Sequence, residues 1–192
     1  MSYKKEVRKM YKNIALQMGV KAPPLIIIGN SKSLNASDHN VIITINKSLA
    51  KLVYMDTDLV KCMIAHELTH SKNGDTKTRQ KNLFKIFSKR VLAYSLVCEM
   101  RASIGGYTYI GMKSELSIME TEKKFKVPKL LADKKSAYRF GYPTSEQIAF
   151  FASQFDKMTV EIAKELLEDY CIVFNIKDKE KFIDHVIEVV KI

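Results

Sequence analysis

The chain has 192 residues, of which 46% are hydrophobic and 28% charged, and this composition is typical of a folded domain and not of a disordered protein. No stretch approaches the roughly 18 apolar residues of a membrane-spanning helix, and the first residues lack the apolar region of a signal peptide. Its three cysteines form no Cys-x-x-Cys pair, and their odd number argues against a disulfide framework. We therefore expect a soluble, cytoplasmic protein without a transmembrane span.

The net charge of +11 is unevenly distributed along the chain. Residues 1–143 carry a balance of +15, whereas residues 144–192 carry −4. Such asymmetry can indicate a nucleic-acid or anionic-membrane partner. No basic motif with interleaved aromatic residues accompanies the charge, so a lysine-rich solubilising surface is the favoured interpretation and nucleic acid is the less favoured one.

The first third of the chain predicts one helix and a small sheet. Apolar residues spaced by three and four predict a helix over residues 2–18, which ends before Pro23. Two short β-branched runs, Leu25–Ile28 and Val41–Ile45, predict strands. The polar segment 31–40 between them is predicted to be a loop, and no further strand is expected.

A helix is predicted from about residue 56 to 71. Asp56 or Thr57 is its expected N-cap, because both side chains can accept a hydrogen bond from the first turn. Gly74 is expected to end it, since glycine tolerates the left-handed conformation that follows many helices.

The remaining chain is predicted to be almost entirely helical. A helix from about residue 76 to 103 begins with basic turns and continues with apolar ones, so it is expected to run from the surface into the core. Gly105 and Gly106 are expected to end it. Further helices are predicted near residues 112–125, 129–137, 144–154, 157–174 and 178–190.

The sequence His66-Glu67-Leu68-Thr69-His70 carries the strongest chemical signal. Two histidines four residues apart share one face of a helix, so both imidazoles can bind one metal ion. Glu67 lies about 100° round the helix axis, within reach of a water on that metal. This pattern is typical of zinc hydrolases, with Glu67 as the general base. The alternative is a pair of solvated or core histidines on an amphipathic helix.

A catalytic zinc ion takes three protein ligands, so a third must come from elsewhere in the chain. The metzincin pattern would require a glycine at position 73 and a histidine at position 76, where this chain has Asn73 and Thr76. The other histidines, His39 and His185, are candidates, although both are more typical of surface residues.

Glu99 is the favoured third ligand. It lies where the following helix is expected to enter the core, and a buried carboxylate requires a cationic partner. An antiparallel return of the chain after Gly74 would bring Glu99 beside His66 and His70. The alternative is a surface Glu99 that pairs with Arg101 or a lysine.

The stretch from His66 to Asp75 resembles the H-E-x-x-H-x-x-x-G-D signature of the gluzincin metallopeptidases. It is most similar to the branch that contains the heat-shock protease HtpX and the CAAX-prenyl endopeptidases, and to their small soluble relatives, the minigluzincins. The resemblance implies a third zinc ligand in an E-x-x-A-D motif, which Glu99 and Ala102 match. Ser103 replaces the aspartate that usually supports a zinc-binding histidine. Asp75 matches a family position and is expected either to cap the next helix or to support the site.

The same resemblance implies how substrate is bound. The family places an edge strand above the active-site helix, and Val41–Ile45 is the segment expected to pair with substrate there. Tyr142 precedes Pro143, where the membrane branch often has a histidine, so it is a candidate for stabilising the oxyanion. The alternative is a tyrosine packed at a turn. The membrane spans of that branch are missing from this chain.

Together these patterns predict a mainly helical α+β protein with a zincin-like catalytic core, which consists of a small sheet and an active-site helix, and with a C-terminal helical lobe. We expect one domain over residues 1–192, with the core at about 20–110 and the lobe at about 111–192. The predicted function is a zinc-dependent metalloendopeptidase acting on a peptide or protein substrate. The alternative is a non-catalytic zincin-like regulatory protein that binds a protein or nucleic acid through its basic surface, although such a module would have no use for Glu67 as a base.

Overall fold

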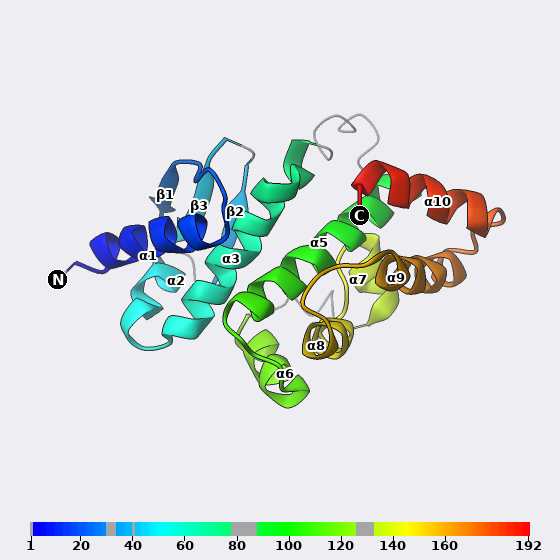
Figure 1. Ribbon diagram of the computed structural model, residues 1–192. Helices are drawn as coiled ribbons and strands as arrows, with labels where there is room; N and C mark the ends of the chain where they lie inside the picture. Colours follow the sequence, from blue (N-terminus) through cyan, green and yellow to red (C-terminus); the bar gives the residue numbers. More distant parts are fainter. Residues whose placement is uncertain (1, 30–33, 40, 78–87, 126–132) are drawn as a thin grey trace.

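The computed structural model describes residues 2–29, 34–39, 41–77, 88–125 and 133–192 (Figure 1). Across these ranges the chain is mainly helical, with one small sheet near the N-terminus, as the predicted α+β class requires. No helix within them is both long and apolar enough to cross a membrane.

The sheet has three strands, β1 (Leu25–Ile28), β2 (Ala36–Asp38) and β3 (Ile43–Asn46), in the order β1-β3-β2. β1 is parallel to β3 and β2 is antiparallel to it. β1 and β3 confirm the two predicted strands. β2 lies inside the segment predicted to be a loop, because Ala-Ser-Asp contains no β-branched or aromatic residue that would mark a strand.

The position of β2 corrects one prediction. β1 pairs with one edge of β3 and β2 with the other, so β3 is the central strand of the described sheet. The assignment of Val41–Ile45 as the substrate-pairing edge strand is therefore wrong, and β2 occupies the edge beside the helix that carries the two histidines.

The N-terminal helices pack with the sheet around one hydrophobic core. They are α1 (Tyr3–Gln17), α2 (Lys47–Lys51), the 3₁₀ turn η1 (Leu52–Tyr54) and α3 (Thr57–Asn73). Asp56 is the N-cap of α3, where its carboxylate accepts a hydrogen bond from the backbone N–H of Leu59 at 3.2 Å. Gly74 ends α3 in the left-handed conformation at φ 67°, as predicted.

The helix α5 (Lys89–Tyr109) runs through the middle of the molecule. Gly105 and Gly106 do not end it, which corrects a second prediction. These glycines lie against α3 instead: a Cβ at Gly106 would come 2.9 Å from the carbonyl oxygen of Cys62, and one at Gly105 would come 2.4 Å from Thr69 Oγ1. The absent side chains allow the two helices to approach closely. Most of the start predicted for this helix, residues 78–87, lies outside the described residues.

The C-terminal helices surround the other side of α5 and form a second hydrophobic core with it. They are α6 (Glu115–Lys124), α7 (Lys134–Arg139), α8 (Ser145–Gln154), α9 (Val160–Val173) and α10 (Lys179–Val190). They confirm the predicted helices. Residues 126–132 are not described, so the start of the helix predicted near 129–137 lies outside the described residues. The two cores meet between α3 and α5. The predicted division into a catalytic core and a C-terminal lobe near residue 110 stays a prediction.

Candidate metal centre

α3 places His66 and His70 one helical turn apart, as the spacing predicts. Their rings lie edge to face with centroids 4.9 Å apart, and their Nε2 atoms are 3.2 Å apart. His70 is buried and His66 is half-buried, so the pair lies at the wall of a pocket. The two nitrogens converge on one point, which is what a shared metal ion requires.

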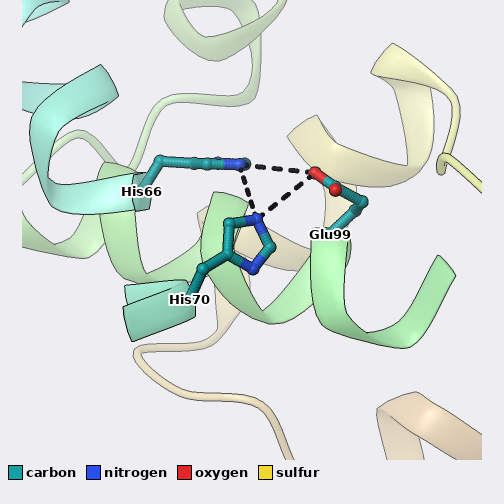
Figure 2. A group of neighbouring side chains, drawn as sticks. All are labelled: His66, His70 and Glu99. Atoms are coloured by element: carbon teal, nitrogen blue, oxygen red, sulfur yellow. Dashed lines mark hydrogen bonds and ion pairs between the residues drawn. The ribbon is translucent and has the colours of Figure 1, made fainter. Parts of the chain in front are cut away.

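α5 brings Glu99 to the same point. Its Oε2 atom lies 3.4 Å from His66 Nε2 and 3.5 Å from His70 Nε2 (Figure 2). α3 and α5 lie side by side and run in opposite directions, so the chain does return antiparallel, as the prediction required. Glu99 is buried, with 5% of the residue exposed, which excludes the surface alternative.

The spacing of these three atoms fits a zinc ion. Ligand atoms about 2.1 Å from a tetrahedral zinc ion lie about 3.4 Å from one another. The observed separations of 3.2, 3.4 and 3.5 Å agree with that figure. Two imidazole nitrogens and one carboxylate oxygen are also a common set of ligands for catalytic zinc, and they leave a fourth position open. Within the described ranges, no second group of this kind is found.

A buried network orients His70. Asp75 Oδ2 accepts a hydrogen bond from His70 Nδ1 at 2.9 Å, so the lone pair of His70 Nε2 is directed at the metal position. Arg101 donates to the other oxygen of Asp75 and, through Nη1, to the carbonyl oxygen of Val190 at 3.1 Å. Asp75 therefore supports His70, which is the second of its two expected roles.

The sequence predicts for Arg101 only a role as an alternative partner of Glu99. The structure pairs it with Asp75, on the far side of His70 from Glu99. A buried arginine close to a buried carboxylate indicates an ion pair. The sequence contains no signal that identifies Asp75, 26 residues away, as the partner.

The carboxylates of the site favour a cation. Burial alone would lower the pKa of His70, but the charge of Glu99 and the hydrogen bonds that the ring donates to Asp75 and Glu99 outweigh it. With the charge of Glu67 they raise this pKa to about 10. Without a metal, His70 therefore holds a proton at neutral pH. A divalent cation would compete with that proton.

Glu67 lies in the same electrostatic environment. Burial raises the pKa of its carboxyl, whereas the charges of His66 and His70 and a hydrogen bond from the backbone of Asp38 lower it; Glu99 raises it further. A general base needs a pKa nearer neutrality than that of an ordinary glutamate, and desolvation moves Glu67 in that direction.

A pocket of about 490 Å³ contains the three potential ligands and Glu67. Residues 34–38 form part of its wall, so the edge strand β2 borders the site. Asp38 attaches β2 to the end of α3, because its carboxylate accepts hydrogen bonds from Ser71 Oγ at 3.0 Å and from Thr76 Oγ1 at 2.6 Å.

The register of β2 turns part of its backbone away from β3. Two backbone hydrogen bonds fix this register: His39 N–H donates to the Ile42 carbonyl oxygen, and Asn46 N–H donates to the Asn35 carbonyl oxygen. In an antiparallel pair, only every second residue of a strand forms such bonds with its neighbour. The N–H and C=O groups of Ala36 therefore point away from β3, along the free edge.

The other candidates from the sequence are also placed. Tyr142 borders the pocket at 41% exposure. His39 Nε2 lies 3.2 Å from Thr44 Oγ1 on the sheet, and the ring of His185 lies 6.2 Å from that of Tyr94. Neither of these histidines belongs to the metal-binding group.

Comparisons with known proteins do not assign the chain to a family. No family model matches it, and no significant match exists among curated proteins or solved structures.

Proposed function

We propose that this protein is a zinc-dependent metalloendopeptidase. The observation that carries the proposal is the geometry of His66, His70 and Glu99, whose ligand atoms have the mutual spacing of a tetrahedral zinc site. The buried carboxylate of Glu67 in the same pocket supplies the base that a structural metal site would not need.

The residues have distinct roles in this proposal. His66, His70 and Glu99 hold the metal, and Asp75 fixes the orientation of the His70 ring. Zinc, when bound, acts as a Lewis acid that lowers the pKa of a water and polarises the scissile carbonyl. Glu67 takes a proton from that water and passes it to the leaving amine.

The edge of β2 offers a binding site for the peptide backbone. A substrate strand would pair with the N–H and C=O groups of Ala36 that point away from β3, which would hold it across the pocket. The Tyr142 hydroxyl, at the rim of the same pocket, is proposed to donate a hydrogen bond to the developing oxyanion.

Replacement of the base tests this function. We expect Glu67→Gln to bind zinc like the wild type and to hydrolyse a mixed peptide pool about 10²- to 10⁴-fold more slowly, as followed by mass spectrometry. Glu120→Gln, on the exposed face of α6, is the control and should retain full activity. Substantial hydrolysis by Glu67→Gln would contradict the proposal.

The zinc-loaded wild type also distinguishes this function from the alternative. If it hydrolyses nothing in the pool and instead binds DNA with a strong dependence on salt, the basic protein is better described as a regulatory binding protein.

A further inference from the structure

A fourth carboxylate borders the pocket and has no role in the proposed mechanism. The pocket is bordered by Asp38, Glu67, Glu99 and Glu122. The first attaches β2 to α3, the second is the proposed base and the third is a proposed metal ligand. Glu122, on α6, remains unexplained.

Glu122 is buried, with an exposure of 8%. Tyr107 donates a hydrogen bond to its Oε1 atom at 2.6 Å, and among the described residues this is the one hydrogen bond that the carboxylate receives. A phenol is neutral, so the charge of an ionised Glu122 is not compensated there. Burial of an uncompensated carboxylate is costly, and the cost falls when a cation binds beside it.

Among the described residues, no lysine or arginine side chain lines the pocket beside Glu122, although the chain has 32 lysines and arginines. Apolar side chains, including Phe125 and Ile148, line it together with Glu122. A carboxylate in a partly apolar pocket suits a cation on an aliphatic stem, whose methylene groups pack while its charge is paired.

Glu122 lies toward one end of the site. Its partner Tyr107 is eight residues beyond Glu99 on α5, which is a little over two turns, or about 12 Å along the helix axis. Burial raises the pKa of the Glu122 carboxyl, and the hydrogen bond from Tyr107 opposes that rise. Glu122 and the three potential metal ligands line one pocket. A cationic group bound at Glu122 and the peptide bond cleaved at the metal position would therefore belong to the same substrate molecule.

We propose that Glu122 binds a cationic group of the peptide substrate, either a lysine or arginine side chain or the N-terminal ammonium, in the pocket that contains the metal position. This inference rests on the proposed peptidase function and defines its substrate class.

Peptide binding to an inactive enzyme tests the inference directly. The protein is full-length, zinc-loaded Glu67→Gln. The probes are alanine pentapeptides, acetylated and amidated, with a central lysine, arginine, norleucine or glutamate, together with a pentaalanine amide whose N-terminus is free. Calorimetry should show the lysine and arginine peptides binding about 10- to 100-fold more tightly than the norleucine peptide.

Substitutions at Glu122 must remove that preference. Adding Glu122→Gln, which keeps an oxygen for Tyr107 to donate to, should abolish it, whereas Glu122→Asp should retain part of it. Glu120→Gln, exposed on the same helix, should leave it unchanged. If only the free-amine pentaalanine gains affinity through Glu122, the inference holds and the cation is the N-terminus.

Other outcomes overturn the inference. Equal affinity for the lysine, arginine, norleucine and free-amine peptides would overturn it. So would a preference for a cation that survives Glu122→Gln, an equal loss for every peptide in that variant, or no detectable binding. Hydrolysis of the peptide pool by the wild type separates the two proposals. Cleavage without any preference for a cation overturns this inference alone, whereas no cleavage overturns the peptidase function and leaves Glu122-dependent binding to stand by itself.

Discussion

The two ends of the pocket differ in how their buried charges are compensated. At the metal end, Asp75 is paired with Arg101 and His70, and Glu99 lies within 3.5 Å of two imidazole nitrogens. At the other end, Glu122 receives its hydrogen bond from the neutral Tyr107. The protein itself therefore assembles the metal end, and we propose that a substrate cation completes the other.

Removal of Asp75 should have the largest effect on the metal end. Asp75→Asn leaves the buried Arg101 without a charged partner, so we expect a loss of about 3–5 kcal/mol in the free energy of unfolding. Zinc affinity should fall about 10- to 100-fold, because the His70 ring loses the carboxylate that orients it. Chemical denaturation and competition with a zinc chelator measure the two quantities.

Asp58→Asn is the matched control, since Asp58 pairs with Lys61 on the exposed surface of α3. Its unfolding free energy should change by no more than about 0.5 kcal/mol. If Asp75→Asn resembled this control in both stability and zinc affinity, the buried network would not support the site.

A substitution at the helix crossing should disturb both ends together. In Gly106→Ala, the new methyl group would meet the Cys62 carbonyl oxygen at 2.9 Å, and because that contact is with the backbone, α3 and α5 must separate. We expect a cost of about 1–3 kcal/mol in unfolding free energy and weaker zinc binding.

Gly29→Ala is the control for this substitution, because its Cβ would meet nothing within 4 Å. Denaturation of both variants decides the comparison. A Gly106→Ala protein as stable as the wild type would show that the close approach of the helices is dispensable.

The pH dependence should have opposite signs for zinc affinity and for stability. In the metal-free protein the pKa of His70 rises from 6.5 to about 10 on folding, so its stabilising contribution is complete below pH 6.5 and is lost as the pH rises toward 10. Thermal melts of the metal-free protein should therefore show falling stability over that range. Zinc must displace the same proton, so its affinity should rise by up to about tenfold per pH unit there. Zinc affinity that is independent of pH would contradict this assignment.

The sequence predicted those parts of the site that depend on local spacing. His66 and His70 converge because they are one turn apart on a helix, and Glu99 follows from the antiparallel return of the next helix. The roles of Arg101 and Glu122 were not predicted, because their hydrogen-bond partners lie 26 and 15 residues away and no local pattern connects them. The Gly105–Gly106 pair was misinterpreted, since a glycine that ends a helix and one that allows close packing are identical in sequence.

The sheet shows the same limit. β1 and β3 are rich in β-branched residues and were predicted, whereas β2 forms only because its backbone pairs with β3. Its Asp38 side chain is held by Ser71 and Thr76, which no pattern within the strand reveals.

Metal analysis of the wild type and Glu99→Ala, both purified without chelator, tests the central claim most directly. The account predicts about one zinc ion per chain in the wild type and markedly weaker retention in the variant, because two imidazoles alone form an incomplete site. Equal retention by both proteins would remove Glu99 from the site. A wild type that contains no zinc and takes up none when it is added would contradict the account as a whole.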